Sequence, residues 1–199
     1  MSEFQAYLGL GFDHISDLQG YDHILFIVAL CAVYKLSQWK QVLILVTAFT
    51  VGHSITLALA TLKLVTIPQA ITEFFIPVTI LITALYNVFN GVNEGKSKRQ
   101  GITYLLALFV GLIHGMGFSN FLASLLGKEA SITVPLLSFN IGLELGQLII
   151  VTCILVVAFF VLSVFKAKHR DWNLFVSGAA AGISFIMMLE RLPDMLEAW

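Results

Sequence analysis

One histidine stands in the middle of an apolar stretch of this chain. His114 lies in Gly111-Leu-Ile-His-Gly-Met-Gly-Phe-Ser119, among three glycines. An imidazole at the depth of a lipid bilayer is costly without a partner, so such a residue indicates a functional site. Gly111 and Gly115 have no side chain, which lets a neighbouring helix or a ligand approach the backbone closely. We therefore expect His114 to bind a metal ion, against the alternative that it only hydrogen-bonds a neighbouring helix.

Two other apolar stretches also carry histidine. His53 lies in Thr50-Val-Gly-His-Ser54, where Thr50 or Ser54 can support the imidazole from the next turn. Asp22 and His23 are adjacent, so their side chains point in different directions on a helix. One of the two can bind a metal while the other orients it or forms an entrance. For each of these residues, a hydrogen bond that holds helices together remains the alternative.

A carboxylate and two amides share one face of a later apolar stretch. Asn140, Glu144 and Gln147 are spaced i, i+4 and i+7. A carboxylate at bilayer depth must be protonated, paired with a cation or bound to a metal. We expect Glu144 to be a metal ligand or proton carrier, with Asn140 and Gln147 supporting it. A structural pair with another buried residue stays open.

The N-terminal segment adds acidic residues and one more histidine. His14, with Asp13 and Asp17 nearby, either completes an outer metal site or lies at the membrane interface. Glu73 stands near the start of another apolar stretch, where a solvated carboxylate at a helix start is the favoured interpretation. Together with Asp22, these residues would form an acidic entrance that attracts cations.

This set of side chains indicates which metals would bind. Histidines and carboxylates, without a cluster of cysteine or methionine, suit divalent nickel, cobalt, zinc, iron or manganese rather than Cu(I). The same histidines could hold a catalytic zinc with an open position for water. The cysteines Cys31 and Cys153 fall inside apolar stretches, and we interpret both as small buried packing residues.

The composition places the chain in the membrane. Of its 199 residues, 58% are hydrophobic and 12% are charged. Soluble domains average about 25% charged residues, so the sequence predicts an integral membrane protein. Its length leaves room for six spans with short loops and no separate soluble domain. The net charge of −1 gives no reason to expect binding to nucleic acid. The partners we expect are the lipid bilayer and a metal ion, and a homo-oligomer stays open.

Hydropathy predicts a single all-α domain over residues 1–199, a bundle of about six transmembrane helices. Residues 1–20 mix apolar and charged side chains, which indicates a short interfacial helix against the bundle. The predicted spans cover about residues 21–36, 41–62, 68–90, 101–126, 132–165 and 172–192. Within the last span, Gly178 and Gly182 form a motif of small residues typical of helix packing, and Glu190 and Arg191 would cap its outer end.

The distribution of basic residues predicts the orientation. Loops after the first, third and fifth predicted spans hold eight Lys and Arg: Lys35, Lys40, Lys96, Lys98, Arg99, Lys166, Lys168 and Arg170. The opposite side holds three: Lys63, Lys128 and Arg191. By the positive-inside rule both termini face outward, and the candidate ligands then gather in the outer half of the bilayer.

Four segments resemble the HupE/UreJ family of hydrogenase- and urease-accessory membrane proteins. They are Gly20–Phe26, Thr47–Leu57, Gly111–Phe118 and Phe139–Gln147. The resemblance implies a secondary permease for nickel or a similar divalent metal in a bacterial inner membrane. It also implies that Asp22, His23 and His114 handle the metal. Nickel-associated members carry a histidine six positions before this aspartate, where Ser16 stands here.

The leading hypothesis from the sequence is a permease that binds a divalent transition metal in its outer half and moves it inward. His23, His53, His114 and Glu144 would replace the water shell of the ion. The alternative is an intramembrane metal-dependent hydrolase acting on a lipid or small amide, with Glu144 or Asp22 as general base. A third interpretation is a membrane partner or sensor in which the polar groups only hold helices together.

Overall fold

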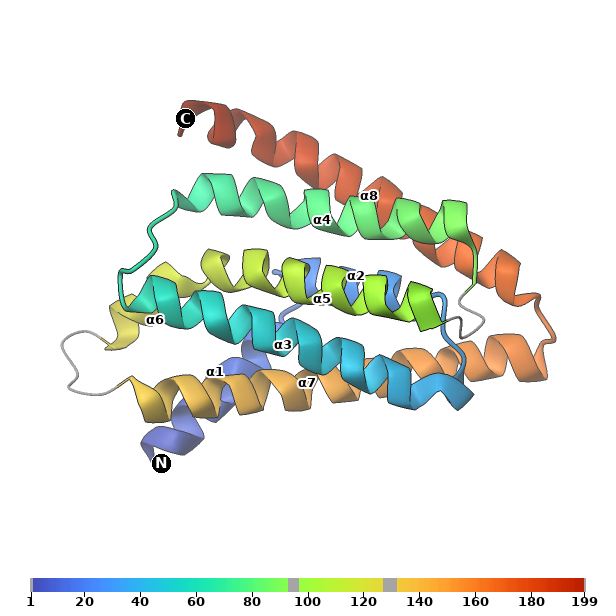
Figure 1. Cartoon of the computed structure of the whole chain (residues 1–199), viewed down its shortest axis with the longest axis horizontal. Coiled ribbons are helices and arrows are strands. Elements are labelled where there is room, and N and C mark those ends of the chain that lie inside the picture. The colour runs from blue at the N-terminus through green and yellow to red at the C-terminus, as the bar shows by residue number, and fades with distance from the viewer. Residues whose placement is uncertain (1, 93–96, 127–131, 199) are drawn as a thin grey trace.

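The computed structural model describes residues 2–92, 97–126 and 132–198, and throughout these residues the regular structure is helical (Figure 1). Long helices run side by side along the molecule. The first helix begins and the last helix ends at the same end of the bundle (Figure 1). Lys96 and Lys128 lie outside the described residues, as do the side chains of Lys98 and Arg99. The all-α fold predicted from the sequence is confirmed.

Five helices are long and apolar enough to cross a membrane. Each corresponds to a predicted span. In lipid, a helix pairs its own backbone N–H and C=O groups, and its apolar side chains are compatible with the acyl chains. They are α3 (Trp39–Thr61, preceded by the 3-10 turn η1, Leu36–Gln38), α4 (Gln69–Asn90), α5 (Ser97–Gly117), α7 (Thr133–Phe159, continued by the π-helical turn η2, Phe160–Val164) and α8 (His169–Glu197).

The N-terminal region contains two short helices instead of one long one. These are α1 (Glu3–Ser16) and α2 (Asp22–Cys31). Ser2 caps α1, accepting a hydrogen bond from the backbone of Gln5. Where one span is expected over residues 21–36, α2 has 10 residues, about half the length that a single helix needs to cross a bilayer. The break between α1 and α2 lies beside the candidate site described below.

A second break interrupts the predicted span over residues 101–126. Helix α5 ends at Gly117, and a separate short helix, α6 (Ser119–Leu126), follows it. The hydroxyl of Ser119, the first residue of α6, donates to the carbonyl of Met116 in the last turn of α5. This side-chain hydrogen bond satisfies a carbonyl at the end of α5.

Glycines bring two pairs of helices into backbone contact. In the α3–α5 pair, a Cβ on Gly52 would lie 2.2 Å from the carbonyl oxygen of Leu108, and one on Gly111 equally close to that of Phe49. In the α1–α7 pair, a Cβ on Gly11 would lie 2.0 Å from the carbonyl oxygen of Phe139. No other residue fits at such distances. The predicted close approach at Gly111 is confirmed, and the neighbour is α3.

The α4–α8 pair is held differently, by buried polar side chains. The amide of Asn173 on α8 donates to the carbonyl of Asn87 on α4 over 2.9 Å. The amide of Asn87 in turn donates to the carbonyl of Ala29 on α2 over 2.7 Å. Hydrogen bonds between side chains and the backbone therefore connect α4, α8 and α2.

One packing prediction finds no partner helix among the described residues, and another was wrong in part. A Cβ added to Gly178 or Gly182 would meet no atom within 4 Å, so within the described chain this motif packs against nothing. Both glycines lie on the outward face of α8 because Asn173, Ser177 and Ala180 occupy the buried face. Cys31 is buried as expected, whereas Cys153 is exposed on α7.

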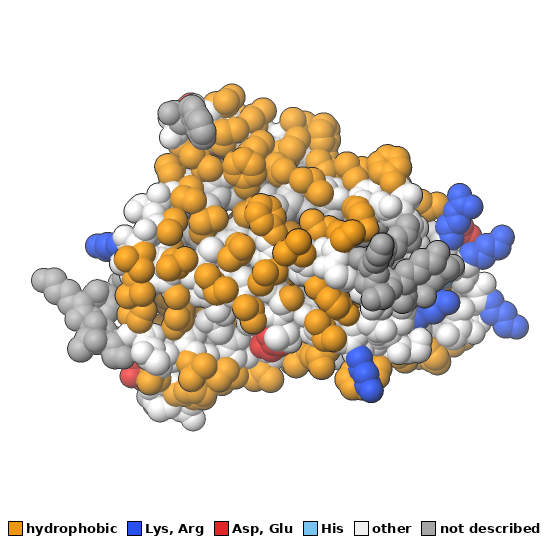
Figure 2. Space-filling model, in the orientation of Figure 1, with side chains coloured by type: hydrophobic (Ala, Val, Ile, Leu, Met, Phe, Trp, Pro, Cys, Tyr) orange, Lys and Arg blue, Asp and Glu red, His pale blue; other side chains and the backbone are white. Residues whose placement is uncertain are grey.

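The surface has an apolar middle and a basic end. Hydrophobic side chains cover the middle of the visible face, and Lys and Arg gather at the end where α7 meets α8 (Figure 2). Lys166 and Lys168 lie in the connection between these helices, and Arg170 lies in the first turn of α8. This distribution is that of an integral membrane protein with one strongly basic face.

Candidate metal centre

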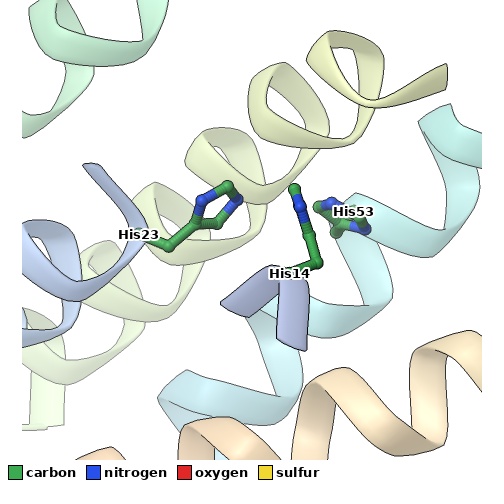
Figure 3. Close-up of side chains that lie close together, drawn as sticks. All are labelled: His14, His23 and His53. Carbon is green, nitrogen blue, oxygen red and sulfur yellow. The ribbon is translucent and has the colours of Figure 1, made fainter. Parts of the chain in front are cut away.

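Three histidines from three different helices meet inside the bundle (Figure 3). His14 lies in the last turn of α1, His23 in the first turn of α2 and His53 in the middle of α3. One ring nitrogen of each lies within 4.8 Å of the others. The sequence predicted all three as ligands, although they are separated by segments of very different length. We call them the histidine trio.

The trio carries ring nitrogens with no hydrogen-bond partner in the described part of the chain. They are Nε2 of His14, Nε2 of His23 and both nitrogens of His53. His53 is completely buried and His23 is 5% exposed. Buried polar atoms in native proteins are almost always paired, since leaving one unpaired costs about 1–3 kcal/mol. Nitrogens with free lone pairs that converge in this way fit a metal ion.

His114 lies beside the trio. Its ring centre on α5 is 4.8 Å from that of His23, and the two planes are nearly perpendicular, at 85°. Both of its nitrogens are also buried without a partner among the described residues. His114 therefore adds a fourth imidazole next to the trio, on the side of His23.

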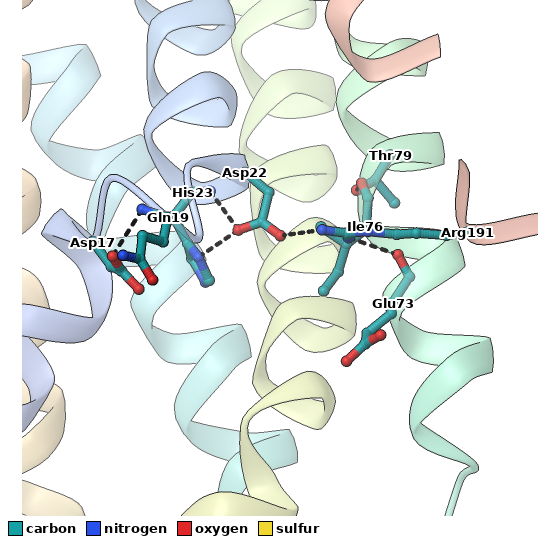
Figure 4. Close-up of polar contacts among 8 residues, drawn as sticks. All are labelled: Asp17, Gln19, Asp22, His23, Glu73, Ile76, Thr79 and Arg191. Carbon is teal, nitrogen blue, oxygen red and sulfur yellow. Dashed lines mark hydrogen bonds and ion pairs between the residues drawn. The ribbon is translucent and has the colours of Figure 1, made fainter. Parts of the chain in front are cut away.

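Asp22 lies between His23 and Arg191 and contacts both side chains (Figure 4). Its Oδ1 lies 2.9 Å from Nδ1 of His23 and also accepts the backbone N–H of His23. With the Nδ1 proton directed at the carboxylate, Nε2 of His23 keeps its lone pair for a ligand. This is the arrangement by which carboxylates fix the ring and tautomer of metal-binding histidines.

Arg191 reaches the same site from α8, a contact that the sequence interpretation missed. One guanidinium nitrogen lies 3.3 Å from Oδ2 of Asp22, and the other donates to the carbonyl of Glu73 over 2.9 Å (Figure 4). The prediction that Arg191 caps the end of its helix was wrong, because α8 continues to Glu197. The signal was present in the sequence: Arg191 follows Ser184 and Ser177 at intervals of seven, on the buried face of α8.

A cavity of about 300 Å³ opens beside these residues. Its polar lining consists of His14, Asp17, Asp22, His23, Glu73, His114 and Arg191. Asp17 and Glu73, both predicted at an entrance, thus line it, and Asp17 also accepts the backbone N–H of Gln19 over 2.8 Å. Asp13 is exposed on α1 and is absent from the lining.

Glu144 lies apart from the histidines. Its carboxylate accepts the hydroxyl of Thr47 over 2.7 Å, between α7 and α3. Thr47 precedes His53 by six residues, about 9 Å along a helix. Gln147 on the same face accepts the hydroxyl of Thr50 over 2.8 Å. The structure does not bring these predicted site residues to the trio.

Two other predicted supporting residues lie close to His53. The side chain of Asn140 is within reach of the His53 ring, and its own oxygen is buried without a partner among the described residues. Ser54 donates its hydroxyl to the carbonyl of Thr50, within its own helix. Ser16 likewise donates its hydroxyl to the carbonyl of Phe12. His14, one half-turn earlier, supplies the imidazole at this end of α1.

Aromatic rings enclose the histidines. The ring centres of Phe118 and His14 are 3.9 Å apart. The ring centre of Phe49 lies 5.3 Å from that of His114 and 6.0 Å from that of His53. Phe139 stacks on both Phe118 and His53. These rings exclude water from one side of the trio, which strengthens electrostatic interactions there. The sequence analysis did not identify them, because phenylalanines are frequent throughout an apolar chain.

The comparison with known families agrees with the four resembling segments. Residues 1–191, essentially the whole chain, match the family described as HupE / UreJ protein. No curated protein matches the chain. No solved structure matches it either. With the match covering the trio, His114 and Arg191 alike, the chain belongs to the HupE/UreJ family.

Proposed function

We propose that this protein is a membrane permease for a divalent transition metal, nickel or a similar ion, and that the histidine trio binds the ion during transport. The observation that carries the proposal is the convergence of buried, unpartnered imidazole nitrogens from three helices. Imidazole ligands favour nickel, cobalt and zinc over calcium or magnesium. The family suggests a role related to transport of nickel or another metal.

Binding would draw the trio together. Metal-to-nitrogen bonds of about 2.1 Å place two ligands of a tetrahedral ion about 3.4 Å apart. The nitrogens of the trio lie within 4.8 Å of one another. To reach the separation of about 3.4 Å, the most distant pair would approach by roughly an ångström. Asp22 would orient His23 and Arg191 would balance the charge of Asp22. Asp17 and Glu73, on the wall of the cavity, would attract the hydrated ion.

The two short helices would together cross the membrane once. Helix α1 begins at the end of the bundle where α8 ends (Figure 1). Five long helices alone would place the start of α3 and the end of α8 on opposite sides. Adding α1 and α2 as one discontinuous span makes six crossings, with both termini on the outer side. Discontinuous helices beside a binding site are a common feature of secondary transporters.

Buried polar side chains lie along the α4–α8 interface. Three side chains of α4 and three of α8 are buried there: Thr79, Thr83, Asn87, Asn173, Ser177 and Ser184. Thr79, Thr83 and Ser184 donate their protons to carbonyls of their own helices, so lone pairs of their oxygens remain for a cation. We propose that the ion leaves the trio past Arg191 and follows these oxygens.

The test is metal flux into liposomes that contain the purified protein and a metal-sensitive dye. We expect nickel, cobalt or zinc to enter, and His14→Ala or His53→Ala to abolish the entry. His169→Ala is the matched control, because His169 lies at the basic end of α8, away from the trio. No flux of any of these ions above empty vesicles would rule out transport.

The hydrolase alternative makes a different prediction. A catalytic zinc is held tightly by three ligands, with the fourth position open. Metal that stays bound through prolonged dialysis against a chelator, together with absent flux, would favour this alternative. Metal that exchanges freely with the medium agrees with transport.

A further inference from the structure

A second cavity lies at the basic end of the molecule, away from the histidines. It has a volume of about 440 Å³ and lies between η1 and the end of α7. Its lining consists of Lys35, Leu36, Ser37, Phe159, Leu162 and Ser163. None of these residues lines the cavity beside the histidine trio. The proposed transport function therefore leaves this cavity unexplained.

The polar lining offers donors that the protein does not use. The ammonium group of Lys35 has no carboxylate partner among the described residues, where both recorded ion pairs involve Asp22. The hydroxyls of Ser37 and Ser163 have no recorded hydrogen bond in this part of the structure either. In contrast, the hydroxyl of Thr152, earlier on α7, donates to the carbonyl one turn before it. One ammonium and two free hydroxyls around a cavity suit a phosphate group.

The remaining lining is apolar and faces outward. Phe159 is 43% exposed and Leu36 is 42% exposed. Together with Leu162, they give the cavity an apolar wall, and the nearby side chains of Val156 and Phe160 are exposed as well. A free inorganic anion would leave this wall without a partner, whereas an amphipathic molecule would use both halves.

The neighbouring residues place the cavity at the level of lipid headgroups. Trp39, the first residue of α3, is 53% exposed. The ammonium nitrogen of Lys40 lies 5.6 Å from the centre of its ring. Exposed tryptophan beside lysine is typical of the membrane–water interface. Lys166 and Lys168 connect the nearby ends of α7 and α8, and Arg170 lies in the first turn of α8, so the field there favours anionic lipids.

A local change in helix geometry shapes this cavity. Residues Phe160–Val164 form a π-helical turn in which the N–H of Phe165 bonds to the carbonyl of Phe160. The wider turn places Ser163 out of the regular α-helical register. Such π-turns occur frequently at functional sites because they redirect individual side chains.

We infer that this cavity binds one anionic phospholipid from the leaflet at the basic end. Lys35, Ser37 and Ser163 donate hydrogen bonds to the headgroup phosphate, and the acyl region lies along Phe159 and Leu162. The inference does not depend on metal transport, since it uses no residue of the candidate metal centre.

Native mass spectrometry of the detergent-solubilised full chain tests the inference, with phosphatidylglycerol and phosphatidylcholine as probes. We expect one phosphatidylglycerol per chain, bound more tightly than phosphatidylcholine. Lys35→Ala should weaken this binding about tenfold, as expected for the loss of one charge-assisted hydrogen bond. Ser163→Ala should also weaken it, and Lys35→Arg should retain most of it. Lys40→Ala is the matched control and should have no effect.

Three outcomes would overturn the inference. Equal affinity for the two lipids would remove the headgroup selectivity. Equal effects of Lys35→Ala and Lys40→Ala would indicate general attraction to the basic end rather than a site. Displacement of the lipid by inorganic phosphate at the same concentration would show that the apolar wall contributes nothing. All variants change exposed side chains, and unaltered thermal unfolding in phosphatidylcholine would establish that they fold.

Discussion

The α3–α5 pair and the α4–α8 pair pack in opposite ways, although both join long apolar helices. In α3–α5, Gly52 and Gly111 bring backbone against backbone, and nothing larger fits. In α4–α8, buried amides and hydroxyls fill the interface, including Asn87 and Asn173. A glycine contact has one geometry, whereas hydrogen-bonding side chains can exchange partners. The comparison suggests a fixed part that carries His53 and His114 and a part that can move beside it.

The site lies where these two parts meet. The trio belongs to α1, α2 and α3, and glycine contacts hold α1 on α7 as well. Arg191 belongs to α8, and among the described residues its ion pair with Asp22 links it to His23 of the trio. A movement of α4 and α8 would therefore break the contact between Arg191 and Asp22 without displacing the histidines. We expect mutations in the two parts to separate folding from transport.

The largest effect should come from filling a glycine contact. Gly52→Ala places a methyl group 2.2 Å from a backbone oxygen of α5, and the helices must separate at a cost of about 3 kcal/mol or more. Thermal unfolding in detergent measures the loss. Gly178→Ala is the matched control, because an added Cβ there meets nothing within 4 Å. Equal unfolding temperatures for the two variants would contradict a backbone contact between α3 and α5.

The next effect concerns the connection between the parts. Asp22→Asn keeps the shape of the side chain but weakens its hold on His23, so metal affinity should fall about 10–100-fold. Isothermal titration with nickel or zinc measures the change, and thermal unfolding without metal should change little. Asp17→Asn serves as the comparison, because Asp17 lines the cavity without contacting His23 in any recorded bond. A smaller effect for Asp22→Asn than for Asp17→Asn would argue against the orienting role.

A moderate effect is expected in the polar interface. Asn87→Ala removes the hydrogen bond to the carbonyl of Ala29 on α2. The variant should still fold, with an unfolding free energy lower by about 1 kcal/mol. Metal affinity should stay unchanged, while flux in liposomes should fall, because Asn87 lies on the proposed inward route. If flux and affinity fell together, the α4–α8 interface would not be separable from the binding site.

The smallest effect is expected at Glu144. Its carboxylate bonds to Thr47, away from the trio, so Glu144→Gln should leave the metal dissociation constant within about twofold of the wild-type value. The same titration measures this. A loss comparable to that of His53→Ala would restore Glu144 as a ligand and require a rearranged site.

Part of this organisation could be predicted from the sequence. Apolar length located the five long helices. Histidine at bilayer depth pointed to His53 and His114, whereas His14 was singled out by the acidic residues around it in the N-terminal segment. Glycine spacing around His114 indicated a close helix contact. These features are local, since each depends on the composition of one segment of the chain.

Other features depend on neighbours that the sequence does not name. Helical spacing placed Asn140, Glu144 and Gln147 on one face, but it could not tell which helix that face meets. Hydropathy averaged over a window of about 19 residues merged the short helix α2 with its flanks into one span. Arg191 was assigned to a helix end because a charge near a terminus usually lies in solvent. Its role depends on Asp22, which is 169 residues distant in the chain.

The most direct test of the histidine trio is X-ray absorption spectroscopy of the nickel- or zinc-loaded protein, with metal content measured on the same sample. We predict one metal ion per chain, with imidazole scattering from about three histidines at about 2.1 Å. His53→Ala should lose this signal and His169→Ala should keep it. A protein that binds no metal, or whose imidazole signal survives the loss of His53, would contradict the account.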